Sequence, residues 1–183
     1  MKNREADILI VRGLGGGSPD HWYARWEDKL ATTRTVQQTN WHAPDLMSWT
    51  ERLVAETATA QKPVVLIGHS LGVATIVQAA HKLKAFDVRA AFLVAVPDID
   101  LASEALPEIA GFGPLSRDPL PFPSVLVASR TDPHCAYETA DDLGAAWGSL
   151  VVDAGDSGHL NPESGHGPWP EGLMVFSRMM SRL

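Results

Sequence analysis

Short runs of apolar, often β-branched residues recur along the chain, and stretches with helical spacing separate most of them. Such runs are typical of strands that are buried on both faces, as in a parallel sheet. Apolar positions three or four residues apart predict helices with one face on the core. The pattern predicts six strands, at residues 7–12, 35–39, 64–67, 88–96, 124–129 and 150–153. It predicts five helices, at residues 21–31, 48–60, 73–83, 136–147 and 168–183.

The alternation of strands and helices predicts an α/β fold with three layers and about six mostly parallel strands. A length of 183 residues suits one domain, so we expect residues 1–183 to form a single α/β domain. Ser48 and Glu51 predict a capping box at the start of the second helix. Gly148 predicts the end of the fourth helix.

The segment Gly68-His69-Ser70-Leu71-Gly72 joins the third predicted strand directly to a predicted helix. A strand, a Gly-x-Ser-x-Gly pentapeptide and a helix form the context of a nucleophile elbow, a sharp turn that projects a reactive serine above a sheet. The glycines let the strand and the helix pass close together. Amide N–H groups at the helix N-terminus favour negative charge that develops there. Ser70 is therefore the candidate nucleophile.

A glycine-rich loop, Gly13-Leu14-Gly15-Gly16-Gly17, follows the first predicted strand. The dinucleotide pattern Gly-x-Gly-x-x-Gly fails because Ser18 stands at its third glycine, and the chain has no Gly-Lys-Ser/Thr phosphate loop. Hydrolases with an elbow take one oxyanion donor from the residue after the serine and another from a loop after an early strand. The candidate donors are the N–H of Leu71 and the N–H of Leu14 or Gly15. The alternative for this loop is a flexible turn.

A serine hydroxyl needs a base, and an imidazole oriented by a buried carboxylate suits this role. Hydrolases with an elbow place these residues in the order serine, Asp or Glu, histidine. Asp132 follows the fifth predicted strand and His159 follows the sixth, so they are the candidate acid and base. The other acidic residues near strand ends fit this order less well: Asp98, Asp100, Asp153 and Asp156.

Other histidines compete with His159 for the role of base. His166 is the main rival, but it lies further from the last predicted strand. His69 adjoins the serine and is expected to point to another side, so we interpret it as structural. For His21, at the start of a predicted helix, we favour a capping or surface position. Three side chains are nevertheless candidates for lining the pocket: His21, His134 and Phe112.

Residues 97–122 contain five prolines and lack a regular pattern. Because proline interrupts helices and removes a backbone donor, we expect an irregular packed cover here and no lid of several helices. This cover is expected to bring Leu106, Ile109 and Phe112 near one side of the serine. A thin cover offers little apolar wall, so we expect a shallow site that favours short acyl groups.

Composition and charge narrow the range of functions. A net charge of −7 without blocks of like charge argues against nucleic acids and membranes as partners. Cys135 is the only cysteine, so an intrachain disulfide and a cysteine-rich metal site are excluded. We expect no metal and no cofactor. The apolar run at residues 8–11 is too short for a signal-peptide core, and no run reaches transmembrane length, so we expect a cytoplasmic protein.

Several segments together resemble one known family: residues 13–16 with 21–22, 40–44, 68–72, 120–123, 128–133, and 158–161 running into 165–172. They are similar, nearly end to end, to the small cap-less α/β-hydrolases of the retinoblastoma-binding protein 9-like family. This resemblance implies that Ser70, Asp132 and His159 are nucleophile, acid and base. The Leu-x-Cys-x-Glu motif of the mammalian member is absent, so the resemblance does not imply that protein partner.

We therefore expect a serine hydrolase that cleaves a small ester, thioester or amide through an acyl-serine intermediate. The expected partner is a small-molecule acyl substrate. Two alternatives remain open: a protein-interaction module with this fold and little or no catalysis, and an acyltransferase whose acceptor is not water. The fold alone does not decide between them.

Overall fold

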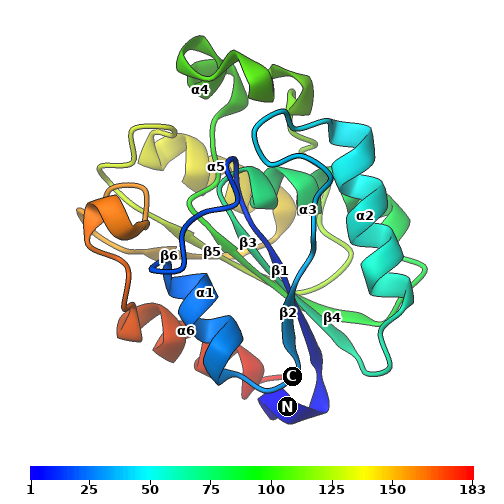
Figure 1. Ribbon diagram of the computed structural model, residues 1–183. Coiled ribbons are helices and arrows are strands. Elements are labelled where there is room, and N and C mark those ends of the chain that lie inside the picture. The colour runs from blue at the N-terminus through cyan, green and yellow to red at the C-terminus, as the bar shows by residue number, and fades with distance from the viewer.

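One parallel sheet forms the centre of the computed structural model, which describes residues 1–183 (Figure 1). Its order is β2-β1-β3-β4-β5-β6, and all neighbouring strands are parallel. The strands are β1 (Asp7–Val11), β2 (Thr33–Thr35), β3 (Val64–His69), β4 (Val88–Val94), β5 (Ser124–Ala128) and β6 (Leu150–Asp153). The strand order reverses at β1, which has β2 on one side and β3 on the other. Ligands of open α/β sheets bind at the carboxyl edge beside such a reversal.

Helices cover both faces of the sheet and complete three layers (Figure 1). One face carries α1 and α6, and the other carries α2, α3 and α5. The α-helices are α1 (Trp22–Lys29), α2 (Leu46–Ala58), α3 (Leu71–Leu83), α4 (Ile99–Ala105), α5 (Tyr137–Trp147) and α6 (Pro170–Met180). The 3₁₀ helices are η1 (Asn3–Glu5), η2 (Pro107–Phe112) and η3 (Pro162–Ser164). None of these helices has both the length and the apolar character needed to cross a bilayer.

Alternating side chains of the central strand β3 enter the two cores. Val64 and Leu66 pack with residues of α2, α3 and α5, whereas Val65 and Ile67 pack with residues of α1 and α6. All four side chains are buried. Complete burial of such a side chain contributes about 1.5–3 kcal/mol, so both helix layers are needed to keep β3 from water. The predicted three-layer α/β fold is confirmed.

The edge strand β2 differs from its prediction. It ends at Thr35, whose N–H points away from β1 on the open side of this edge strand and donates to the carboxylate of Glu27 at 2.7 Å. Only the N–H of Val36 still reaches β1 beyond this point, at the carbonyl of Ile10. The prediction of a strand at residues 35–39 is therefore wrong, because the chain leaves the sheet where that strand was expected to begin.

The start of α2 was also predicted wrongly. Asp45 is the N-cap, and its carboxylate accepts a hydrogen bond from the N–H of Ser48 at 2.8 Å. Ser48 therefore lies in the first turn and does not form the capping box expected with Glu51. The carboxylate of Asp45 satisfies a free amide of a helix that begins about one turn earlier than predicted, which explains the shift. Gly148 does end α5, with a left-handed φ of 69°.

The segment between β4 and β5 contains more helix than its prolines suggested. It forms α4 and η2, which Figure 1 shows above the carboxyl edge of the sheet. Pro107 stands at the start of η2, where a missing N–H is tolerated. Ile109 and Phe112 are buried against Trp49, so the segment is fastened to the body of the protein. The expectation of a packed cover without a lid domain is confirmed, and the expectation of an irregular one is wrong.

The contact between α3 and β1 predicts a strong effect of substitution at Gly72. A Cβ there would lie 1.9 Å from the carbonyl oxygen of Val11, a backbone atom that cannot turn aside. We expect Gly72→Ala to lower the free energy of unfolding by about 3 kcal/mol, measured by urea unfolding. Gly111→Ala is the control, because nothing lies within 4 Å of its Cβ, and its effect should stay within about 0.5 kcal/mol. Equal midpoints for the two variants would contradict the packing described.

Candidate active site

Ser70 occupies a strained turn between β3 and α3. Its φ of 55° and ψ of −124° lie outside the regions that side chains with a Cβ commonly adopt. Gly68 and Gly72 on either side have no room for a Cβ, and a Cβ on Gly13 would lie 2.9 Å from that of Ser70. These contacts are the ones that a nucleophile elbow requires, since strand, helix and the loop after β1 converge on the serine.

Ser70, His159 and Asp132 lie in one hydrogen-bonded chain. The Nε2 atom of His159 is 2.9 Å from Ser70 Oγ, and Nδ1 is 2.9 Å from each oxygen of Asp132. A carboxylate only accepts, so Nδ1 carries the proton and Nε2 accepts from the serine hydroxyl. One oxygen of Asp132 also accepts from the N–H of His134 at 2.9 Å, which fixes the carboxylate.

The loops that carry Asp132 and His159 are tied together through Ser129, at the end of β5. The hydroxyl oxygen of Ser129 accepts from the N–H of Thr131 at 3.3 Å and from the N–H of Ser157 at 2.9 Å. Its hydrogen bonds to the carbonyl of Gly155 at 3.2 Å. One buried hydroxyl therefore links both loops and holds their separation.

Backbone contacts hold the ring of His159 in place. The carbonyl of His159 accepts from Nε2–H of His69 at 3.0 Å, and the carbonyl of Leu160 accepts from the indole N–H of Trp22 at 2.9 Å. Both donors are buried. His69 thus has a structural role beside the serine, as its sequence position suggested.

The backbone amides of Leu71, the first residue of α3, and of Leu14, in the loop after β1, have no acceptor within the protein. The N–H of Gly15 is instead engaged with the carbonyl of Trp41 at 2.8 Å. Of the two candidate donors in the glycine loop, only Leu14 is therefore free to bind an oxyanion beside Ser70.

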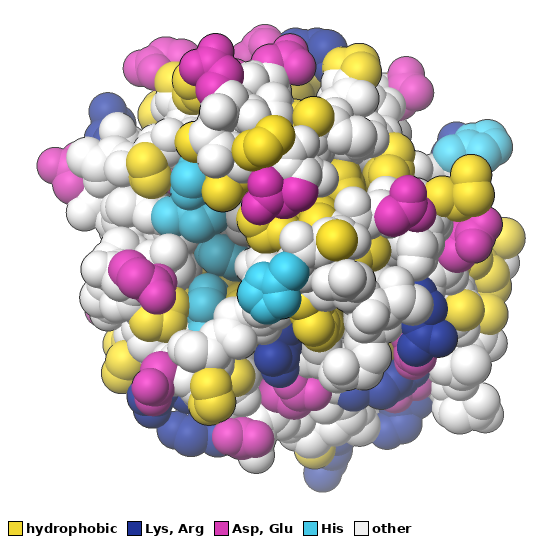
Figure 2. Space-filling model, turned by 45° about the horizontal axis from the view of Figure 1, so that its top comes forward, with side chains coloured by type: hydrophobic (Ala, Val, Ile, Leu, Met, Phe, Trp, Pro, Cys, Tyr) yellow, Lys and Arg dark blue, Asp and Glu magenta, His cyan; other side chains and the backbone are white.

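A cavity of about 270 Å³ contains Ser70 in its wall. Figure 2 shows histidine side chains gathered along a hollow of this face. Most of the residues in the cavity wall are glycines or carry hydroxyl, amide, imidazole or carboxylate groups. The lining residues are Gly13, Leu14, Gly17, Ser18, His21, Tyr23, His69, Ser70, Leu106, His134, His159, Asn161, Pro162 and Glu163.

Three of the histidines in this wall are held neutral by burial. Burial, with smaller contributions from His159 and Arg12, lowers the pKa of His21 to about 3. Complete burial places the pKa of His69 well below its usual value, and partial burial lowers the pKa of His134. Each histidine therefore offers one N–H donor and one lone pair at neutral pH, and none brings a positive charge.

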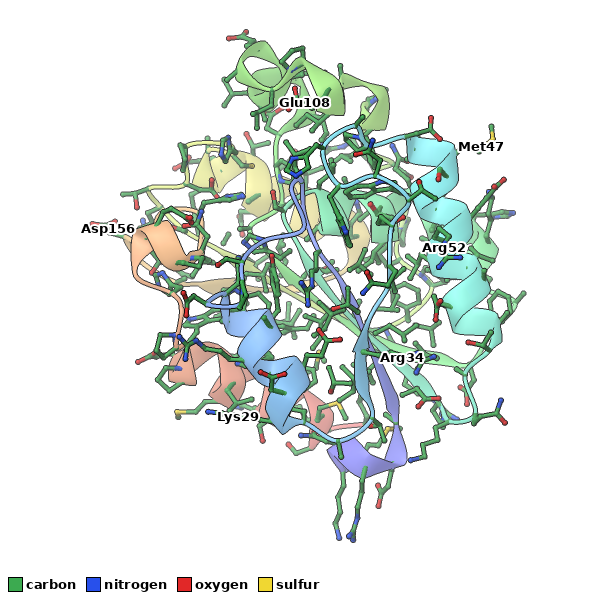
Figure 3. All side chains as sticks on the ribbon, viewed as in Figure 1. Lys29, Arg34, Met47, Arg52, Glu108 and Asp156 are labelled. Carbon is green, nitrogen blue, oxygen red and sulfur yellow. The ribbon has the colours of Figure 1, made fainter.

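Two of the rival acids, Asp153 and Asp156, are exposed and are not part of this hydrogen-bonded chain, and the one cysteine is buried. Asp153 is exposed and paired with Arg130 at 2.6 Å. Asp156 is exposed and lies at the outer edge of the molecule (Figure 3). Burial and the charge of Asp132 raise the pKa of the Cys135 thiol to about 12, so it stays protonated and unreactive.

The candidate pocket-lining residues have different outcomes. His134 and His21 lie in the cavity wall. His21 stands at the N-cap position of α1, as one alternative expected, but its side chain makes no capping hydrogen bond. It is only 4% exposed, so the surface alternative is wrong. Phe112 does not line the cavity, because its ring is fully buried edge-on against Trp49. Ile109 is buried in the same cluster, and of the three cover residues only Leu106 reaches the cavity.

Several cavity residues were not singled out from the sequence: Ser18, Tyr23, Asn161, Pro162 and Glu163. Two features of the sequence pointed toward them. Ser18 follows directly on the glycine loop and Tyr23 lies five residues further on, and the other three follow shortly after His159. Loops that carry oxyanion donors and a base also supply the walls around them, so neighbours in the sequence become neighbours in the cavity.

Comparisons with known proteins identify the family and the fold. A protein-family model described as serine hydrolase matches residues 8–178 of this chain. A solved structure described as a YdeN-like hydrolase from Pectobacterium atrosepticum is 27% identical, with a TM-score of 0.83 over 95% of this chain and 90% of that chain. The ydeN gene product of B. subtilis is 18% identical, with a TM-score of 0.78 over 96% and 99%. Est1E of Butyrivibrio proteoclasticus, solved with ferulic acid, is 13% identical, with a TM-score of 0.74 over 98% and 90%. No curated protein matches the sequence significantly.

The link through Ser129 generates a stability prediction. Ser129→Ala leaves two N–H groups and one carbonyl without their side-chain partner, so we expect the free energy of unfolding to fall by about 1–3 kcal/mol. Ser181→Ala is the control, because Ser181 is exposed and bonds only to a carbonyl of its own turn. It should change stability by at most about 0.5 kcal/mol in the same urea titration. An equally small change at Ser129 would show that the two loops are held by other contacts.

Proposed function

Because the chain belongs to the serine hydrolase family, we propose that it cleaves a small ester, thioester or amide through an acyl-serine intermediate. The observation that carries this proposal is the chain of 2.9 Å contacts from Ser70 Oγ through His159 to Asp132. A serine nucleophile, its histidine base and the carboxylate that orients the histidine must lie in this order and within hydrogen-bond distance of one another. The elbow conformation of Ser70 supports the same assignment.

In the first half of the proposed reaction, Ser70 Oγ attacks the carbonyl carbon of the substrate while its proton passes to Nε2 of His159. The amides of Leu71 and Leu14 donate to the oxygen that becomes negatively charged. His159 then gives the proton to the leaving oxygen, sulfur or nitrogen, and the acyl group remains on Ser70. Asp132 keeps the proton on Nδ1 and stabilises the imidazolium that forms in between.

In the second half, water replaces the leaving group. His159 takes a proton from the water as its oxygen attacks the acyl carbon, and the same two amides stabilise the second oxyanion. Collapse of this intermediate returns the proton to Ser70 and releases the acid. Every proton transfer in this scheme uses Nε2 of His159, so no further acid or base is required.

The size of the cavity supports a small substrate. Its volume of about 270 Å³ lies just below the usual range for pockets that hold drug-sized ligands, roughly 300–1,000 Å³. Only three aliphatic side chains line it, Leu14, Leu106 and Pro162, so a long alkyl chain finds few aliphatic side chains to pack against. We therefore propose that the substrate carries a short acyl group, in line with the resemblance to small cap-less hydrolases. We also propose that the protein is cytoplasmic.

The direct test is covalent labelling with a fluorophosphonate, whose reactive phosphorus is attacked by an activated serine. We expect the wild-type protein to be labelled at Ser70 alone and to hydrolyse p-nitrophenyl butanoate. Ser70→Ala should abolish both, with an unchanged circular dichroism spectrum as the check on folding. A Ser70→Ala protein that is still labelled would refute the assignment. A well-folded wild type that neither labels nor turns over the ester would favour the interaction module instead.

Substitution of the candidate acid tests the role of the hydrogen-bonded chain. Asp132→Asn removes the acceptor that keeps the proton on Nδ1 of His159, so kcat should fall by a factor of about 10⁴. Asp156→Asn is the matched control, since Asp156 is an exposed carboxylate of the neighbouring loop (Figure 3). Its kcat for p-nitrophenyl butanoate should stay within about twofold of wild type. If the two variants lose activity equally, Asp132 is not the acid.

A further inference from the structure

His21 is a buried polar side chain that the proposed mechanism does not use. Its ring is only 4% exposed, and its Nδ1 atom is completely covered and has no hydrogen-bond partner. No protein atom bonds to its other nitrogen either. Buried polar atoms are nearly always paired, because an unpaired one loses its hydration without compensation. His21 lies in the wall of the cavity beside the candidate nucleophile, and its Nε2 atom has no partner and is not fully covered, so Nε2 is the atom that can bind a ligand there.

Neighbouring rings hold the imidazole of His21 in one orientation. It stacks on Tyr23 with the ring centroids 3.6 Å apart and the planes at 16°, and it meets the edge of His69 at 4.7 Å. Tyr23 itself is fixed against the glycine loop, where a Cβ on Gly17 would collide with its hydroxyl oxygen. A ring fixed in this way spends little conformational entropy on binding, which suits a residue that selects a ligand.

The surroundings of His21 indicate what kind of group it would bind. No Lys or Arg lines the cavity, and its one formal charge besides the ionisable histidines is the carboxylate of Glu163. The imidazole of His21 is neutral at physiological pH, because burial lowers its pKa to about 3. With Nδ1 covered, the neutral imidazole presents only Nε2 to the cavity, as a donor in one tautomer and as an acceptor in the other, and a hydroxyl or an amide can match either role. An anionic group finds no counter-charge in this wall.

We propose that His21 is a specificity-determining residue that hydrogen-bonds an uncharged hydroxyl or amide group of the substrate. This inference rests on the proposed hydrolase function and adds the chemical class of its substrate: a small ester, thioester or amide with a second, uncharged polar group. His21 lies in the cavity wall that it shares with Ser70. A substrate bound at the serine can therefore reach both residues, with the polar group on either the acyl part or the leaving group.

Two pairs of nearly isosteric esters test this inference. For the acyl side, p-nitrophenyl 3-hydroxypropanoate is compared with p-nitrophenyl butanoate. For the leaving group, 2-hydroxyethyl butanoate is compared with propyl butanoate. For each pair, the preference is the kcat/KM of the hydroxyl ester divided by the kcat/KM of the other ester. This ratio is then divided by the ratio of the two alkaline hydrolysis rates, which corrects for the intrinsic reactivity of the esters. We expect wild type to prefer the hydroxyl ester by about tenfold in one of the two pairs, which identifies the side of the substrate that His21 binds.

His21→Phe keeps a flat ring against Tyr23 and removes both nitrogens, so it should reduce that preference about tenfold. His21→Gln, which can again donate and accept, should restore part of it. His81→Phe is the matched control, because His81 is exposed in the last turn of α3 and outside the cavity, and it should leave the ratio unchanged.

The inference is overturned if wild type shows no preference in either pair, or if His21→Phe folds and keeps the preference. The wild-type measurement decides the matter even where His21→Phe does not fold. Failure of the proposed function is distinguishable from both outcomes, because wild type would then neither hydrolyse p-nitrophenyl butanoate nor react with a fluorophosphonate.

Discussion

The close approach of α3 to β1 is the constraint on which the rest of the site depends. Gly72 lies directly against the carbonyl of Val11, and Gly13 lies against Ser70, with no space for a side chain at either glycine. Because these backbones touch, the first amide of α3 and the amide of Leu14 lie near the same serine hydroxyl. Residues far apart in the sequence thus become one site through contacts that only glycine permits.

The parts of this arrangement that could be predicted from sequence are those set by local rules. The pentapeptide around Ser70 requires a strand before it and a helix after it, and both are visible as apolar patterns. Asp132 and His159 were found because the carboxyl ends of parallel strands meet at one edge of a sheet. The structure brings all three side chains into hydrogen-bond distance, and their catalytic roles are our proposal.

The parts that could not be predicted depend on contacts between distant segments. The spacing of apolar residues predicts that a helix begins at His21. The burial of His21, however, depends on Tyr23 and on His69 at the end of β3. From the sequence, the amides of Leu14 and Gly15 are equally good candidates for the second oxyanion donor. In the structure, the carbonyl of Trp41, from a separate loop, accepts from the N–H of Gly15 and leaves the N–H of Leu14 free. Such competition for a hydrogen bond is decided by tertiary packing, which leaves no periodic trace in the sequence.

The fastened cover over the carboxyl edge also affects the lifetime of the proposed intermediate. Ile109 and Phe112 hold the cover to the body of the protein, so it cannot swing over Ser70 without leaving the core. An acyl group on Ser70 would therefore not be sealed from water by a movement of this cover. In the proposed reaction, water and any other acceptor would compete for the acyl group in the same cavity. An acceptor other than water would receive the acyl group only if it bound in the cavity first.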